Sequence, residues 1–413
     1  MSTITTVATG APRERPIEEW LADQARPAES FGTVGEGDDQ PAIQAVLNAG
    51  YSWRPLPGKS YRLKRALQYT TARRGIVGDG SSTIIMDTSA NGFCNASSSA
   101  SYRYGTNAVG IIATNITRPI LRGVEIKYEN QIDDRFVKAV AFRGCSDIDV
   151  QDVEAWNFTK SLGVFYFGNC QRGRIAENYI HDCTTNSTLF GQISGMEFDN
   201  DDAGSSDIDV FRNRVERLTV GSVFLASCGY QTDGFNVARN TASRIRFRHN
   251  IVRNVGEGFD VFGQKLTLHD NDVQDAYYYG IKLIHGASDC SVKLNRASRC
   301  GLAGIGLFGT DAMTLNTARN KIMHNQISEI DPNGTFSGSA TAGIVLAANG
   351  GTTYLPRDNH INDNHIETPG KYGLLAPLGS GSGNYALRNF ISGATEYPTL
   401  VHASVVPYFA PYV

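Results

Sequence analysis

Four acidic residues in the middle of the chain recur at related positions in short apolar segments. Each lies within two residues of a glycine that opens such a segment; they are Glu197, Asp233, Glu257 and Asp260. Paired carboxyl groups are the usual apparatus for hydrolysing glycosidic bonds, because one donates a proton while the other activates water or attacks carbon. Two carboxylates held close together also raise the pKa of one of them, which keeps a proton available. These residue types therefore predict acid/base chemistry on a sugar.

Polar and aromatic residues accompany the four acidic ones. A tyrosine offers a flat apolar face with a hydroxyl tip, on which a pyranose ring stacks. We expect substrate contacts from Asn236, Lys282, Tyr279, Tyr277, Tyr230, His285 and Asp199. Simpler interpretations stay open: Lys282 neutralises Asp260, His285 is a surface histidine, and the tyrosines pack a corner.

Two alternating series of residues predict the elements that position these side chains. An Asn followed two residues later by an apolar or small residue recurs at 178, 213, 250, 271, 295, 325, 364 and 389. A Gly that opens a short apolar strand recurs at 163, 195, 234, 258, 280, 304, 343 and 373. Short strands with a stacked corner Asn in every repeat predict an all-β fold, a right-handed parallel β-helix. We expect the Asn column to be structural, because a stacked Asn bonds its neighbours' backbone.

Side chains alternate between core and solvent along each Gly-opened strand. The first and third residues after the Gly are apolar and predicted to face the core, so the second faces outward. This second position holds Glu197, Asn236, Asp260 and Lys282 in four successive coils. Coils stack about 4.8 Å apart, which predicts Asp233 and Glu257 about 5 Å apart and Glu197 and Asp260 about 9.6 Å apart.

Longer connections fall on one corner of the predicted coil. The Asn-to-Gly distance is 8 or 9 residues in four coils, but 17, 21 and 18 residues at 178→195, 213→234 and 325→343. Loops inserted on one face of a solenoid usually form the walls of its binding groove. We expect loops around 181–193 and 216–232 to rise beside the acidic residues.

The N-terminal part of the chain predicts a cap on the β-helix. Asp38, Asp39 and Pro41 precede an apolar run that ends at Gly50, which is typical of a short helix. Such a helix covers strand edges that would otherwise aggregate. We expect an arm over 1–30, an opening segment with the capping helix over 31–58, the β-helix over 59–400, and a tail over 401–413.

Three N-terminal segments resemble the start of pectate-lyase-superfamily β-helices, and most of all tailed-phage tailspike polysaccharide depolymerases. They are FGTVGEGDDQPAIQAVLNAG at 31–50, PLPGKSYRL at 55–63 and GIVGDGSSTII at 75–85. The resemblance implies cleavage of a bacterial polysaccharide, with Glu257 and Asp260 as the carboxylate pair and a further carboxylate on an earlier coil. Residues 231–234 are also similar to the Asn-Thr-Asp-Gly element of polygalacturonases.

The resemblance also implies a homotrimer, located in a virion tail or released from cells. The chain departs from the tailspike plan, because we expect neither a long particle-binding domain before the β-helix nor a trimerisation domain after it. Residues 1–20 contain charged residues and no apolar signal segment, so we expect synthesis in the cytoplasm without a signal peptide.

Composition excludes several classes of protein. The 413 residues contain 38 Lys and Arg against 41 Asp and Glu, a balance that disfavours a nucleic-acid binder. No apolar run is long enough to span a membrane. Seven cysteines without CxxC pairs predict buried, reduced thiols. We expect no cofactor: residues 199–204 are similar to a calcium loop, but Ala203 and Val210 stand where ligands belong, so a solvated turn is the better interpretation.

The sequence therefore predicts an endo-acting glycoside hydrolase for a complex bacterial surface glycan. Three alternatives stay open. The first is a lyase or C5-epimerase on a uronate polymer, with Lys282, Tyr279 or His285 as base and a cation, calcium included, that neutralises the carboxylate. The second is an intramolecular glycosyl transferase, for example a fructosyl transferase, which uses the same carboxylates without water. The third is a non-catalytic glycan-binding fibre protein.

Overall fold

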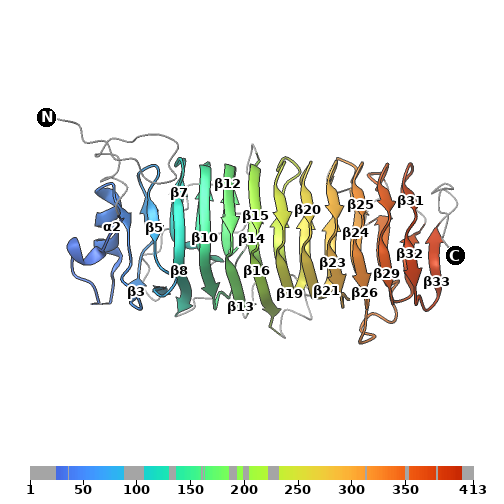
Figure 1. Ribbon diagram of the computed structural model, residues 1–413, viewed down its shortest axis with the longest axis horizontal. Coiled ribbons are helices and arrows are strands. Elements are labelled where there is room, and N and C mark those ends of the chain that lie inside the picture. The colour runs from blue at the N-terminus through green and yellow to red at the C-terminus, as the bar shows by residue number, and fades with distance from the viewer. Residues whose placement is uncertain are drawn as a thin grey trace, which may run out of the picture.

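A parallel β-helix runs through the whole described part of the chain (Figure 1). The computed structural model describes residues 25–35, 37–87, 107–129, 136–159, 161, 163–185, 193–198, 204–221, 232–311, 314–348, 353–377 and 380–401. The strand pairings within these residues are parallel, and each joins one coil to the next. The helix α2 lies at the N-terminal end and the strand β33 at the C-terminal end (Figure 1).

Each coil contributes strands to three faces. The first face contains β1 (Ala25–Arg26), β2 (Ser52–Trp53), β5 (Gly75–Val77), β12 (Gln171–Ala176), β15 (Ser206–Phe211), β18 (Arg246–Arg248), β20 (Thr267–His269), β22 (Ser291–Lys293), β25 (Lys321–Met323), β28 (His360–Asn362) and β31 (Tyr385–Leu387). The long strands β8 (Ile120–Glu129) and β10 (Ser146–Trp156) turn from the first face into the second.

The second face contains β3 (Ser60–Leu63), β6 (Thr83–Asp87), β13 (Tyr179–Thr185), β16 (Arg214–Val220), β23 (Arg296–Ser298), β26 (Gln326–Ser328), β29 (His365–Glu367) and β32 (Phe390–Ser392). The long strands β19 (Ile251–Val261) and β21 (Asp272–Leu283) turn from this face into the third. The third face contains β4 (Leu67–Tyr69), β7 (Asn107–Thr114), β9 (Phe136–Arg143), β11 (Phe165–Gly168), β14 (Ile193–Phe198), β17 (Thr232–Val237), β24 (Ala303–Gly309), β27 (Ala342–Ala348), β30 (Tyr372–Ala376) and β33 (Tyr397–Val401).

The predicted capping helix is confirmed as α2 (Gln40–Asn48), preceded by the short 3-10 helix η1 (Ala28–Ser30). The apolar side of α2 is buried, Ile43 and Val46 completely. Asp39 stands at the N-cap, but its carboxylate does not bond the helix. It accepts hydrogen bonds from the Gly35 and Arg62 backbone N–H groups instead, at 2.6 and 2.7 Å, and so ties the helix to the first coil. The pairing of β1 with β2 extends the β-helix N-terminal to the boundary expected at residue 59.

The predicted Asn column is confirmed as a continuous hydrogen-bonded ladder between the first and second faces. The Asn178 side-chain amide donates to Asn213 Oδ1 at 2.8 Å, and the same bond repeats coil by coil to Asn389. Each of these amides also donates to a backbone carbonyl, as Asn250 does to Val210. A second, unpredicted ladder joins Asn320, Asn359 and Asn384 at another corner.

A column of charged residues in the left-handed region, with φ between 54° and 59°, lies at the same corner as this second ladder. In coil order they are Arg118, Asp147, Arg172, Asp207, Arg244, Lys265, Asp289, Arg319 and Asp358. Their signs alternate along most of the column. Neighbouring coils are joined by ion pairs, including Arg172 with Asp147 at 2.8 Å and Arg319 with Asp289 at 2.6 Å.

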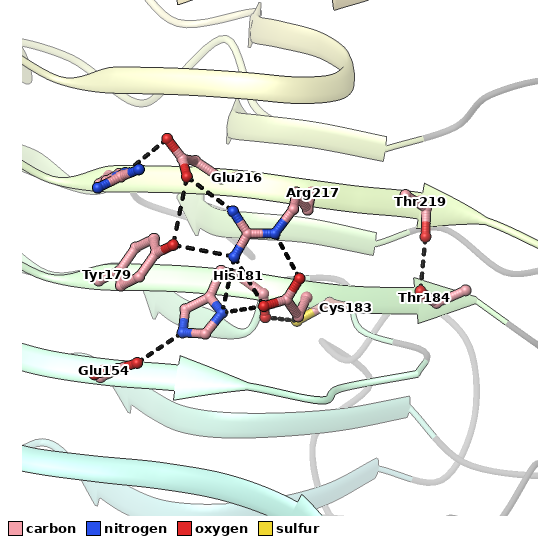
Figure 2. Close-up of polar contacts among 10 residues, drawn as sticks. Glu154, Tyr179, His181, Cys183, Thr184, Glu216, Arg217 and Thr219 are labelled. Atoms are coloured by element: carbon pink, nitrogen blue, oxygen red, sulfur yellow. Dashed lines mark hydrogen bonds and ion pairs between the residues drawn. The ribbon is translucent and has the colours of Figure 1, made fainter.

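A polar network on the second face occupies the coils of β10, β13 and β16 (Figure 2). His181 contacts Glu154 through Nε2 at 2.8 Å and Asp182 through Nδ1 at 2.6 Å. Arg217 pairs with Asp182 at 2.6 Å and with Glu216 at 3.1 Å, and it donates to the Tyr179 hydroxyl at 3.1 Å. We refer to Glu154, Tyr179, His181, Asp182, Glu216 and Arg217 as the arginine–histidine network.

The interior confirms the predicted alternation of side chains. Phe235 and Phe259, each one residue after a Gly, are fully buried and stack with ring centroids 4.9 Å apart. The glycines themselves lie where neighbouring coils pack closely, since a Cβ added at Gly258 would come within 2.3 Å of the Gly280 carbonyl oxygen. The cysteines of the described ranges are buried and free, as predicted; Cys94 and Cys228 lie outside those ranges. None of the helices that the structure describes is long and apolar enough to cross a membrane.

Candidate active site

Two columns of outward-facing residues run along the third face, and the predicted register is confirmed. Strand pairing places Asp233 beside Glu257, and Glu257 beside Tyr279. The second column, on the same strands, contains Glu197, Asn236, Asp260 and Lys282 on successive coils. The β-helix therefore brings together residues that are separated by as many as 85 positions in the sequence.

Three of the four predicted acidic residues form one cluster. Asp233, Glu257 and Asp260 each present a carboxylate oxygen, and these oxygens all lie within 4.8 Å of one another. Asp233, Glu257 and Asp260 are 2%, 7% and 7% exposed, respectively. The three carboxyl groups are thus largely shielded from water, although they lie on the outward side of the coil. We call these three residues the acidic cluster.

Lys282 provides the positive charge beside the acidic cluster. Its Nζ lies 2.5 Å from Glu257 Oε2 and 3.1 Å from Asp260 Oδ1. The simpler interpretation of this lysine, neutralisation of Asp260, is therefore supported. The same ammonium group also forms an ion pair with Glu257. The environment keeps Lys282 charged, because the carboxylates of Asp260 and Glu257 more than offset burial and raise its pKa.

Asp233 is oriented by neutral donors. Its Oδ2 accepts a hydrogen bond from Ser194 Oγ at 3.1 Å and another from the Asn236 side-chain amide at 2.9 Å. These two bonds fix the direction in which the carboxylate points. Asn236, predicted as a substrate contact, thus lies in the site and holds a carboxylate in place.

The other two carboxyl groups have raised pKa values. Burial is the largest cause for Asp260, whose pKa lies well above its ordinary value, with the charges of Glu257 and Asp233 acting in the same direction and Lys282 opposing them. Burial and the Asp233 charge raise the pKa of Glu257 as well, again against Lys282. Burial also raises the pKa of the neighbouring Tyr279 to about 12. The acidic cluster therefore binds a proton more tightly than solvent-exposed carboxyl groups do.

Glu197, the fourth predicted acidic residue, contacts a different partner. Its Oε2 lies 3.7 Å from Lys138 Nζ, and both residues are 2% exposed. Lys138 Nζ also lies 4.6 Å from the ring centre of Tyr166. Sequence reasoning missed Lys138, although a lysine between Val137 and Ala139 in an apolar strand is an unusual feature that could have drawn attention to it.

The remaining predicted contacts are dispersed. Tyr277 lies around the corner from the cluster, in a separate pocket, and His285 packs edge-on against Phe262 at 4.4 Å. Tyr230, Asp199 and the calcium-like segment up to residue 203 lie outside the described residues. So do the centres of two of the long connections, at 186–192 and 222–231, whereas the third, around 331–341, is described.

The acidic cluster has the donor atoms of a cation site, since carboxylate oxygens are the ligands that calcium and magnesium prefer. The Lys282 ammonium group, however, already contacts two of the three carboxylates.

Comparison with known proteins agrees with the coil geometry. Residues 203–391 match a family model described as a right handed beta helix region. The chain therefore has the fold of a right-handed parallel β-helix. The sequence matched none of the curated proteins with which it was compared.

Solved structures of right-handed β-helix proteins resemble this one over most of its length. The A-module of mannuronan C-5 epimerase AlgE4 from Azotobacter vinelandii is 15% identical, with a TM-score of 0.60, covering 93% of this chain and 100% of that one. A tailspike protein of E. coli bacteriophage HK620 is 13% identical, with a TM-score of 0.61 and coverage of 95% and 71%. The catalytic domain of a GH87 alpha-1,3-glucanase, in complex with nigerose, is 12% identical, with a TM-score of 0.60 and coverage of 92% and 66%. At these identities the likeness establishes the fold.

Proposed function

We propose that this protein is an endo-acting glycoside hydrolase that cleaves a complex bacterial surface polysaccharide. One observation carries the proposal: three carboxyl groups meet on an outward face of the β-helix, and burial raises the pKa of two of them. Glycoside hydrolysis needs one carboxyl group that stays protonated near neutral pH and another that stays ionised beside it.

Asp260 acts as the general acid in this proposal. Its pKa is raised well above 3.8, and Lys282 Nζ lies closer to Glu257 than to Asp260. The ammonium group therefore favours the anionic form of Glu257 more strongly, and the shared proton stays on Asp260. Asp260 transfers this proton to the glycosidic oxygen as the bond from that oxygen to the anomeric carbon breaks.

Asp233 acts as the nucleophile, because carboxylate oxygens within 4.8 Å of one another leave no room for a water molecule between acid and base. Ser194 and Asn236 orient its carboxylate, which attacks the anomeric carbon as the glycosidic bond breaks and forms a covalent glycosyl intermediate. Asp260, now ionised, then removes a proton from a water molecule, whose oxygen attacks the anomeric carbon and releases the Asp233 carboxylate. Glu257, ionised beside Lys282, stabilises the positive charge that develops on the sugar ring.

The charges of the site disfavour elimination or epimerisation of a uronate polymer. Such a reaction needs an unprotonated base, but the carboxylates keep Lys282 protonated, and Tyr279 has a pKa of about 12. It also needs a positive charge to neutralise the uronate carboxylate, whereas the acidic cluster repels an anion. These features favour a substrate whose reacting sugar is uncharged.

The similar structures lend support of a general kind. One is described as a glucanase in complex with nigerose and another as a bacteriophage tailspike in complex with a pentasaccharide. Their likeness to this chain makes a carbohydrate ligand the first class to test. The homotrimer and a place in a virion tail remain proposals, and sedimentation equilibrium of the purified chain tests the first of them.

The deciding experiment is mass spectrometry of products from a panel of purified bacterial capsular and O-antigen polysaccharides. We expect the wild type to release oligosaccharides that have each gained one water, and Asp260→Asn and Asp233→Asn to release none. Products lighter by one water would show elimination or a cyclising transfer instead. Binding without products from any polysaccharide would make the chain a glycan-binding fibre protein. A chelator should leave hydrolysis unchanged, because Lys282 supplies the charge of the site.

A further inference from the structure

A pocket of about 500 Å³ lies around the corner from the acidic cluster, where the coil turns from the second face to the third. Its walls include Tyr277, Arg299, Asp331, Asn333 and Phe336. The volume falls within the range of about 300–1,000 Å³ that is usual for small-molecule sites. Aromatic walls with a few polar groups are the surroundings in which a sugar ring binds.

The pocket is connected to the acidic cluster through consecutive aromatic residues. Phe336 lies 5.9 Å from Tyr278, ring centre to ring centre, and Tyr278 lies 6.4 Å from Tyr279. Tyr279 in turn pairs in register with Glu257. A polysaccharide bound at the cluster can therefore continue over the corner along these rings and reach the pocket.

The loop around 331–341 forms the wall of the pocket and holds its shape by internal bonds. Both carboxylate oxygens of Asp331 accept the Phe336 backbone N–H at 3.1 Å. The Phe336 carbonyl accepts the Ser339 N–H at 2.7 Å, and the Phe336 ring lies 5.3 Å from that of Tyr277. Phe336 is thus held over Tyr277 before any ligand arrives, which lowers the entropy cost of binding.

The charges of the pocket select a neutral sugar. Arg299 is occupied by a two-point ion pair with Asp275, at 2.7 and 2.5 Å. The Asp331 carboxylate adds a negative charge, and Asn333 and Thr335 add groups that bond hydroxyls. An acidic sugar would meet repulsion here.

We propose that this pocket is a second sugar subsite, which binds an uncharged unit of the same polysaccharide beyond the cleavage point. The inference rests on the proposed hydrolase function, because the occupant is the substrate of the acidic cluster. It adds Phe336 and the loop around 331–341 to the residues that determine specificity.

Binding without cleavage tests the subsite. In the Asp260→Asn background, immobilised polysaccharides of the capsular and O-antigen panel are probed with the protein, with Phe336→Ala or with Phe336→Leu. Loss of a stacking ring should weaken binding roughly tenfold. Phe336→Leu retains apolar volume without a flat ring and should weaken binding similarly. Phe390→Ala, which removes a 50% exposed aromatic ring on the second face, should leave binding unchanged.

The outcomes separate the subsite from the hydrolase. Equal binding by the protein with and without Phe336→Ala, or no binding of any polysaccharide, would overturn the subsite. A polysaccharide that binds through Phe336 but is never cleaved by the wild type would support the subsite and refute the hydrolase. Circular dichroism melting of each variant shows whether weaker binding reflects the pocket or an unfolded coil.

Discussion

The acidic cluster and the arginine–histidine network are built by the same stacked coils but differ in how their charges are balanced. In the network, Arg217 pairs with both Asp182 and Glu216, and the adjacent Arg214 pairs with Glu216 at 2.6 Å. In the cluster, the ammonium group of Lys282 forms ion pairs with Glu257 and Asp260, and the carboxylate of Asp233 lies beside them. The side chains of Asp182 and Arg217 are 50% and 41% exposed, whereas those of Glu257 and Asp260 are about 10% exposed.

The pKa shifts of the two regions have opposite directions for this reason. The Arg217 guanidinium holds the pKa of Asp182 well below its usual value, against a smaller effect of burial. Burial dominates at Asp260 and raises its pKa. Glu216 shows that pairing matters more than exposure, because its side chain is only 3% exposed and the neighbouring guanidinium groups still lower its pKa against burial. Stacked carboxylates thus acquire unusual proton affinity where they are buried in excess of their counter-ions.

The largest expected effect is on catalysis. Asp260→Asn should lower hydrolysis of a cleaved polysaccharide by about 10²–10⁴-fold, because it removes the proton donor. Asp182→Asn, the matched change in the network, should leave the rate unchanged. Initial rates from a reducing-end assay measure both. Similar losses in the two variants would mean that the regions do not differ in role.

The next effect is on stability. Lys282→Met should lower the free energy of unfolding by about 3 kcal/mol at pH 7, because the buried, ionised carboxylate of Glu257 loses its counter-ion. The loss should shrink at pH 5, where protonation removes the uncompensated charge. Denaturant titrations at both pH values measure it, with Lys282→Arg as the charge-retaining control. A loss independent of pH would point to packing rather than charge.

The pH dependence of stability should distinguish the two regions by on the order of 1 kcal/mol. The pKa of Asp260 is raised above 3.8, so the folded state binds its proton more tightly and stability falls as the pH rises through that raised pKa. Asp260→Asn should remove this fall, which begins above 3.8. For Asp182 the sign is reversed: its contribution is present above 3.8 and disappears as the pH falls through its lowered pKa. Thermal melting of wild type, Asp260→Asn and Asp182→Asn from acid pH below 3.8 up to neutral pH tests the opposite slopes.

The smallest effect is expected from the network. Arg217→Met should cost less than about 1 kcal/mol, because half-exposed ion pairs are screened by water, and the cost should fall further at high salt. A double-mutant cycle with Asp182→Asn isolates the pair. A coupling of several kcal/mol would show that the network is as critical to folding as the buried ladders.

The fold and the site columns were predictable because a β-helix converts sequence spacing directly into spatial register. The Gly and Asn series placed Asp233 beside Glu257 and Asp260 beside Lys282, as the strand pairing confirms. The ladder of Asn320, Asn359 and Asn384 obeys the same Asn-x-apolar spacing. It contains only three residues and begins late in the chain, so its periodicity is weak in the sequence.

Side-chain direction and the loops were less predictable. Glu197 lies in the predicted column, yet its carboxylate contacts Lys138, which spacing between Gly-opened strands does not reveal. The contact of Phe336 with Tyr277 depends on the path of a long connection, and no periodic pattern describes that path. Sequence signals placed the start of the helix near Asp39 but did not reveal that its carboxylate bonds Gly35 and Arg62 rather than helix amides.

The alternating charges of the left-handed corner column have a consequence for assembly of the coils during folding. Repeats that resemble one another can pair with the wrong neighbour, and a stack of similar strands has many such pairings. If the chain skipped one coil, Arg172 would meet Arg244 instead of Asp147 or Asp207, and Asp289 would meet Asp358. Like charges would then face each other at that corner. The alternating charges thus favour pairing of each coil with its neighbour in the sequence over pairing with the coil beyond it.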